Sequence, residues 1–179
     1  MKESRRVKMT KKLIKDAFLT LTEKTPINKV TVKQICEKAD VNRSTFYAHY
    51  ADQYDLFEEI QGDIISITPS ISLYKKQPIF KALTNFLNFI DKNKKIYRIL
   101  FSNSVGADFR NSILNKVFNR DGNSIDWIND EMNLANSMHF KMLMCGFGGM
   151  TMIENWIFDR FEASPEDLAT YMTEYINNV

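Results

Sequence analysis

The sequence predicts an all-helical protein. Its 179 residues are 44% apolar and 26% charged, which is typical of a globular chain and excludes a disordered or collagen-like one. Six glycines and four prolines are too few for an all-β chain, which needs a turn signal about every 8–12 residues. Apolar side chains recur instead at the three- and four-residue spacing of amphipathic helices. We expect about nine helices, divided between a head over residues 1–52 and a body over residues 53–179.

The first predicted helix covers about residues 6–24. Its apolar side chains lie on a single stripe, formed by Leu13, Ile14, Ala17, Phe18 and Leu21. Thr25-Pro26 ends the helix, because proline disfavours the helical conformation of the residue before it. We expect this helix to brace the shorter helices that follow.

Two short helices come next, and each has a start signal. Thr31 and Gln34 form a capping box, in which each side chain accepts a backbone hydrogen bond from the other residue. Asp40 falls where a left-handed residue would end this helix, and Asn42 caps a second one over about residues 43–50. Two short helices joined by a tight turn behind a longer one are the layout of a helix-turn-helix. An ordinary αα-hairpin has the same spacing and is the alternative.

The second short helix presents two different sides. At 100° per residue, Phe46 and Tyr50 share one side and can pack inward. The opposite side is polar or small and consists of Arg43, Ser44, Tyr47 and Ala48. Arginine bonds guanine edges, serine contacts several bases and alanine leaves room for a thymine methyl group, while tyrosine hydroxyls hold phosphates. This side therefore suits the major groove of DNA.

The charge is distributed unevenly along the chain. Residues 1–50 contain 12 Lys/Arg and 5 Asp/Glu, a net charge of +7, whereas residues 51–179 contain 12 and 17, a net charge of −5. A basic head on an acidic body favours a polyanion as the partner of the head. A solvated basic face is the alternative.

Residues 31–56 resemble the N-terminal domain of TetR/AcrR-type transcription regulators. The resemblance lies in the run TVKQICEKADVNRSTFYAHY, residues 31–50, and in the DQYDL that follows a single alanine, and it covers roughly residues 8–58. It implies an all-helical homodimer with a three-helix DNA-binding head and a helical body that dimerises and usually binds an effector.

The resemblance also implies roles for single residues. Arg43 and Ser44 would approach base edges. The phosphate contacts would come from Thr31, Lys33, Thr45, Tyr47 and His49. Two of these have alternatives, because Thr31 serves equally as a helix cap only and His49 as a brace against the first helix. Two positions depart from the family pattern, with Asp40 where glycine is usual and Gln53 where lysine is frequent.

The body is predicted to contain the remaining helices. They cover about residues 53–68, 78–92, 96–101, 108–119 and 133–159, with a last one that Ser164 caps. The helix over 133–159 is apolar nearly all round in its middle and contains three glycines, which favour close backbone approach or a bend. The family pairs its last two long helices across the dimer. The expected seam is Gly146, Met150, Ile153 and Ile157, with the core of the single chain as the alternative.

Enzymatic, metal and membrane functions find no support in the sequence. It contains no glycine-rich phosphate loop, nucleophile elbow or His-Glu-x-x-His run. Two histidines and two distant cysteines, Cys36 and Cys145, are too few for a metal site. The longest apolar stretch near the C-terminus has 12 residues, and a membrane helix needs about 20. We expect no catalytic residue, cofactor or metal, no membrane contact, and a cytoplasmic protein.

Two functional hypotheses follow. The first is a ligand-responsive repressor that binds double-stranded DNA as a homodimer on a near-palindromic operator, since paired recognition helices meet successive major grooves. The body holds most of the Phe and Met residues, which can line a pocket for a small apolar effector of unknown identity. The second is a transcriptional activator, or a protein-interaction module whose body binds a protein instead of a small molecule.

Overall fold

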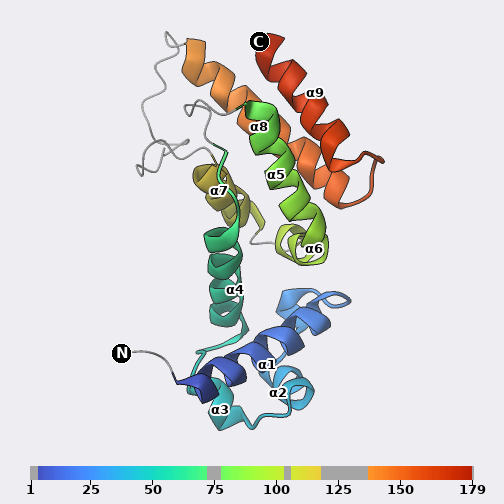
Figure 1. The fold of residues 1–179 in the computed structure, drawn as a ribbon. Coiled ribbons are helices and arrows are strands. Elements are labelled where there is room, and N and C mark those ends of the chain that lie inside the picture. The colour runs from blue at the N-terminus through green and yellow to red at the C-terminus, as the bar shows by residue number, and fades with distance from the viewer. Residues whose placement is uncertain (1–3, 72–77, 103–105, 118–136, 179) are drawn as a thin grey trace. The chain divides into compact units, whose positions relative to one another are not determined.

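The computed structural model describes residues 4–71, 78–102, 106–117 and 137–178. All regular structure in these ranges is helical (Figure 1), which confirms the predicted all-α class. The elements are α1 (Arg5–Thr22), the 3-10 helix η1 (Ile27–Lys29), α2 (Val32–Ala39), α3 (Arg43–Tyr47), α4 (Gln53–Ile67), α5 (Ile79–Lys92), α6 (Lys94–Ser102), α7 (Gly106–Val117), α8 (Ser137–Ile157) and α9 (Pro165–Asn178). The end of the helix predicted over 108–119 and the first residues of the helix predicted over 133–159 lie outside the described residues.

The chain divides into two compact units, residues 1–66 and 67–179. The first unit, here called the head unit, includes most of α4, whereas the sequence analysis ended the DNA-binding domain at residue 52. Leu56, Phe57 and Ile60 of α4 are at most 2% exposed, and the Phe57 ring lies 6.1 Å from the ring of Phe18 on α1. Burial of these apolar side chains makes α4 part of the core of the head unit.

Local capping starts and ends the helices of the head unit. The capping box of α2 is present, because the Gln34 N–H donates to Thr31 Oγ1 over 3.3 Å and the Thr31 N–H donates to Gln34 Oε1 over 2.9 Å. Asp40 ends α2 in the left-handed conformation with φ 53°. Asn42 caps α3, and Asp52 caps α4 by accepting from the backbone N–H of Tyr54. Each of these signals is local in sequence, and those of Thr31, Asp40 and Asn42 were predicted from it.

Helix α3 is shorter than predicted. It ends at Tyr47 and not at Tyr50, and Ala48 is its C-cap. The chain tightens after Phe46, since its carbonyl accepts from the N–H of both His49 and Tyr50. Tyr50 nevertheless stays 2% exposed, so the inward side predicted for this segment is confirmed.

The second unit contains α5 to α9. Helix α5 packs along α9 (Figure 1), and α9 starts at the predicted cap, where the Asp167 N–H donates to Ser164 Oγ over 3.1 Å. Its core is almost wholly apolar and includes Leu83, Phe86, Leu87, Ile90, Leu100, Phe109, Ile113, Trp156 and Leu168. One buried polar pair interrupts it, the hydroxyls of Thr68 and Tyr97, which lie 2.7 Å apart.

The seam predicted on α8 lies in the interior of this chain. Gly146 is buried, and Met150, Ile153 and Ile157 are 0–3% exposed. Side chains buried within one chain have little surface to offer a second copy, which favours the stated alternative, the core of the single chain. A dimer contact by these four residues stays a prediction. Close packing accounts for one of the three glycines of α8, because a Cβ on Gly149 would lie 2.9 Å from Met172 Cε on α9.

Candidate nucleic-acid interface

The outward side of α3 is open to solvent. Tyr47 is 57% exposed, and Arg43, Ser44 and Ala48 are also exposed. Of the other predicted DNA contacts, Thr31 and Lys33 are exposed, whereas Thr45 and His49 are half-buried. Large exposed aromatic side chains are typical of recognition surfaces, and a role of Tyr47 in DNA binding stays a prediction.

The inward side of the same segment holds it in place. Phe46 is fully buried, and its ring lies 5.6 Å from that of Tyr50 and 5.7 Å from that of Tyr47 in an edge-on contact. Aromatic pairs in such geometries add about 0.5–1.5 kcal/mol beyond their burial. Phe46 therefore fixes the segment from behind and also supports the exposed Tyr47.

Hydrogen bonds at the start of α3 order two of the predicted contact residues. Asn42 Oδ1 accepts from the Thr45 N–H, from Ser44 Oγ and from Thr45 Oγ1, each over 2.7 Å. At the start of α2, Thr31 takes part in its capping box, which confirms its capping role, while a phosphate contact from it stays a prediction. Lys33 pairs with Glu37 over 3.8 Å, and both side chains are about two-thirds exposed (64% and 65%), which leaves the Lys33 ammonium group able to move to a phosphate.

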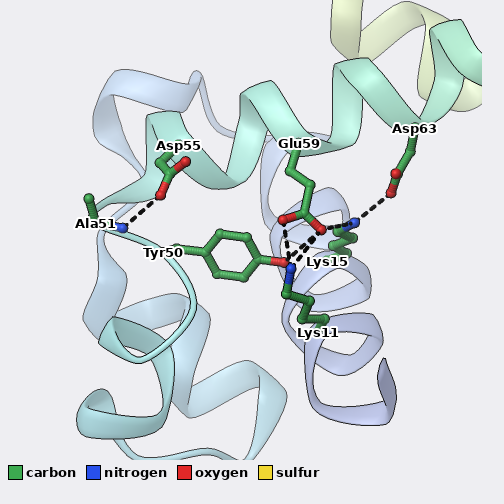
Figure 2. Close-up of polar contacts among 7 residues, drawn as sticks. All are labelled: Lys11, Lys15, Tyr50, Ala51, Asp55, Glu59 and Asp63. Atoms are coloured by element: carbon green, nitrogen blue, oxygen red, sulfur yellow. Dashed lines mark hydrogen bonds and ion pairs between the residues drawn. The ribbon is translucent and has the colours of Figure 1, made fainter. Parts of the chain in front are cut away.

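A polar cluster, here called the α1–α4 clasp, links α1, α4 and Tyr50 in the head unit (Figure 2). It consists of Lys11, Lys15, Tyr50, Glu59 and Asp63. Glu59 receives the ammonium groups of Lys11 at 3.0 Å and Lys15 at 2.6 Å, and the Tyr50 hydroxyl donates to it over 3.4 Å. Asp63 holds Lys15 from the other side over 2.5 Å. The clasp connects α1, α4 and Tyr50, which lies three residues after the end of α3.

Burial and charge act in opposite directions on two groups of the clasp. Burial works to lower the pKa of Lys15, but hydrogen bonds and charges from Asp63 and Glu59 outweigh it and raise that pKa. Burial works to raise the pKa of Glu59, but its bonds to Lys15 and Lys11 outweigh it and lower that pKa. Burial, followed by the charge of Glu59, raises the pKa of Tyr50. All three shifts favour the arrangement seen at neutral pH.

The clasp was missed in the sequence analysis although its spacing is readable. Lys11 and Lys15 are four residues apart on α1, and Glu59 and Asp63 are four residues apart on α4. Each pair therefore lies on one face of its helix, and the two faces have opposite charge. Pairing them requires knowing that α1 and α4 are neighbours, which only the fold shows.

The charges divide differently between the compact units than between the sequence halves. The head unit, residues 1–66, contains 12 Lys/Arg and 10 Asp/Glu, a net charge of +2, and residues 67–179 contain 12 of each. The additional carboxylates come from the start and length of α4, and two of them hold Lys11 and Lys15. Attraction to a polyanion thus depends on where the remaining cations lie and not on a large net charge.

Comparison with known proteins assigns the chain to a family. The model described as "Bacterial regulatory proteins, tetR family" matches residues 14–60, and the model described as "Transcriptional regulator C-terminal region" matches residues 77–178, more than half of the chain. The chain belongs to the TetR family of transcriptional regulators. Regulators of this family are DNA-binding transcription factors, so the prediction that the chain is not an enzyme is confirmed.

Solved structures share the fold of this TetR-family chain. A TetR transcriptional regulator from Streptococcus agalactiae 2603V matches with a TM-score of 0.69 and 22% identity over 96% of both chains. The dihydroxyacetone kinase operon activator DhaS matches with a TM-score of 0.59 and 18% identity over 94% of both chains. A curated relative, the uncharacterized HTH-type transcriptional regulator YxbF of Bacillus subtilis, is 35% identical over 51 residues, which are 28% of this chain and 13% of that protein's length.

The second unit of this TetR-family chain contains a groove of about 290 Å³ between α8 and α9. Its lining is mainly apolar and consists of Met144, Cys145, Gly148, Gly149, Met152, Met172, Tyr175 and Ile176. Within the described ranges, no three His, Cys, Asp or Glu side chains are placed to hold a metal ion. None of the helices described is long and apolar enough to cross a membrane.

Proposed function

We propose that this TetR-family regulator is a ligand-responsive repressor that binds a near-palindromic operator as a homodimer in the cytoplasm. The observation that carries the proposal is the outward side of α3, which is fixed from behind by Phe46 and Tyr50 and exposes Arg43, Ser44 and Tyr47 together. Such a side can enter a major groove without any change in the core of the head unit.

The proposed contacts follow from the chemistry of these side chains. Arg43 can bond a guanine edge through two donors, and Ala48 can sit against a thymine methyl group. Tyr47, Lys33, Thr31 and, where they turn outward, Thr45 and His49 would hold phosphates, which position the head but carry no sequence information.

The dimer contact is proposed on the exposed side of α8 and α9 in place of the buried seam. This side carries apolar residues that are 38–61% exposed, namely Met144, Phe147, Met152, Tyr171 and Tyr175. A Cβ built on Gly148 has no heavy atom within 4 Å, so this part of α8 faces open space. Apolar side chains gathered on one surface mark an association site, and the family pairs these two helices across its dimers.

An apolar ligand is proposed as the effector because the α8–α9 groove is large enough for a small molecule and its walls carry three adaptable methionines. Met144, Met152 and Tyr175 belong both to this groove and to the proposed dimer contact, so the ligand would bind at the edge of that contact. A ligand shifts the regulator only if it binds one body conformation more tightly than another. DhaS, which has the same fold, is named an operon activator, so an activator role is the second candidate for this chain.

The test is selection of bound duplexes from a random pool, followed by affinity measurements on the selected operator. Arg43→Ala and Tyr47→Phe should each weaken binding at least severalfold, and Arg43→Ala should also relax the preference at one base pair. Lys24→Ala and Lys81→Ala are the controls, because both side chains are exposed and belong neither to α3 nor to the proposed dimer contact. The logarithm of affinity should fall with the logarithm of salt concentration with a slope of about −0.9 per phosphate. Equal affinities in all five proteins, or no selected sequence, would refute DNA recognition by this face and favour a protein-binding role.

A further inference from the structure

The amide oxygen of Asn42 receives more hydrogen-bond donors than a cap requires. The Thr45 N–H alone satisfies the N-cap, yet the hydroxyls of Ser44 and Thr45 also lie 2.7 Å from the same Oδ1. A carbonyl oxygen has two lone pairs, so three donors share two acceptor sites. This surplus is a structural feature of the recognition segment that capping does not explain.

The hydrogen bonds also determine the direction of the hydroxyl protons. The Thr45 N–H can only donate, so the atom of Asn42 facing it is the oxygen and not the nitrogen of the amide. A carbonyl oxygen can only accept, so Ser44 and Thr45 must both donate to it. Their protons therefore point at Asn42, and the oxygen lone pairs of Ser44, which is exposed, face away from it.

An outward-facing lone pair selects its partners on DNA. Phosphate oxygens, guanine O6 and N7, adenine N7 and thymine O4 are all acceptors and cannot bond it. The donors on the major-groove edges are the exocyclic amines, N6 of adenine and N4 of cytosine. An amine that donates to Ser44 Oγ also polarises the Ser44 hydroxyl and strengthens its bond to Asn42, because such bonds in a chain reinforce one another.

We propose that Asn42 is a positioning residue that makes Ser44 a hydrogen-bond acceptor, so that the recognition segment reads an exocyclic amine of adenine or cytosine. This inference rests on the proposed function, since it requires the α3 face to enter a major groove. It assigns Ser44 to base reading and not to a phosphate. It also means that Thr45, whose hydroxyl is held by the same oxygen, reaches a phosphate only by leaving Asn42.

The experiment uses the full-length protein and its selected operator carrying single-atom changes. Adenines are replaced one at a time by purine and cytosines by pyrimidin-2-one, which removes the amine, and purines by their 7-deaza forms, which removes the N7 acceptor. In the wild type, removal of one amine should weaken binding about fivefold, the net effect of one neutral hydrogen bond. Ser44→Ala should bind unmodified DNA about fivefold more weakly and lose sensitivity to that same amine.

Two variants of Asn42 separate positioning from folding. Asn42→Gly removes the shared acceptor, and glycine at an N-cap costs only a few tenths of a kcal/mol, so the fold should survive. Its Ser44 hydroxyl is free to rotate, and the sensitivity to the amine should fall to twofold or less. Asn42→Asp keeps the acceptor and should restore that sensitivity, although its added charge weakens binding to all sequences. A structural role alone would change melting temperature without changing which base atom matters.

Three results would overturn the inference. Sensitivity of the wild type to N7 deletion at the Ser44 position, with no effect of any amine deletion, would show that Ser44 donates. An equal loss in Ser44→Ala on specific and non-specific DNA would assign Ser44 to a phosphate. An unchanged amine effect in Asn42→Gly would remove Asn42 from the account. Failure of the proposed function is recognised separately, because the wild type would then select no duplex at all.

Discussion

Replacing the Glu59 carboxylate tests whether the α1–α4 clasp stabilises the head unit. Glu59→Gln keeps the shape and one acceptor but removes the charge that faces Lys11 at 3.0 Å and Lys15 at 2.6 Å. The three side chains are 18–33% exposed, so the pairs lie between the exposed class, worth about 0.2–1 kcal/mol, and the buried class, where loss of a partner costs about 3–5 kcal/mol. We expect a loss of about 1–2 kcal/mol.

The assay is thermal unfolding followed by circular dichroism at equal protein concentrations, since association shifts apparent stability. For a chain of this size, about 1 kcal/mol changes the melting temperature by about 2–4 °C. Asp63→Asn is the matched control. It removes a second carboxylate from the same cluster, but the Asp63 side chain is 60% exposed, so the loss should stay below about 0.5 kcal/mol. Equal losses in the two variants, or none in Glu59→Gln, would refute the reasoning.

The pH dependence of stability predicts the direction in which the effect of Glu59→Gln changes. The folded state lowers the pKa of Glu59, so its contribution is complete above the unfolded pKa and disappears as the pH falls through the folded pKa. The folded state raises the pKa of Lys15, so the contribution of Lys15 is complete below its unfolded pKa and disappears as the pH rises through the folded pKa. The stability difference between wild type and Glu59→Gln should therefore be constant near neutral pH and shrink below about pH 4. A difference that grows on acidification would contradict the assignment.

Three further predictions concern substitutions at Asp40, at the glycines of α8 and at the proposed dimer contact. Asp40→Gly should raise the free energy of unfolding by about 1 kcal/mol, because Asp40 has a φ of 53° and glycine adopts this conformation without strain. An unchanged melting temperature would mean that Asp40 is not strained in this turn. Gly148→Ala should stabilise the isolated chain by nearly the helix-propensity difference of about 1 kcal/mol. Gly149→Ala should keep less of that gain, because its Cβ would displace the flexible Met172 methyl from 2.9 Å; the reverse order of melting temperatures would contradict the packing. Tyr171→Glu should shift the protein from dimer to monomer in sedimentation. Phe80→Glu is the control, because Phe80 is also an exposed apolar residue but lies on α5, and it should leave the dimer intact. An unchanged dimer affinity in Tyr171→Glu would refute the proposed contact.

Local signals account for most of what could be predicted. Thr31, Asn42 and Ser164 start their helices as predicted, because a cap involves atoms only two or three residues apart in sequence. The same holds for Asp40, whose left-handed conformation closes α2. The helical periodicity of the head also placed Phe46 and Tyr50 inside and Tyr47 outside.

The remaining features depend on packing that short-range sequence patterns do not show. The clasp depends on α1 and α4 being neighbours across 48 residues between Lys11 and Glu59, and the extension of the head unit into α4 follows from the same contact. The end of α3 at Tyr47 reflects the tightening of the chain after Phe46, a choice among backbone geometries that periodicity does not distinguish.

The positions of the helices, their caps, the family resemblance and the outward side of α3 can be read from the amino-acid sequence, because each is encoded within a few turns of one helix. Which side of α8 is buried depends on how the whole second unit packs. A helix that is apolar nearly all round carries no sequence signal for its inner side, and Met150, Ile153 and Ile157 face inward because the other helices of this chain cover them.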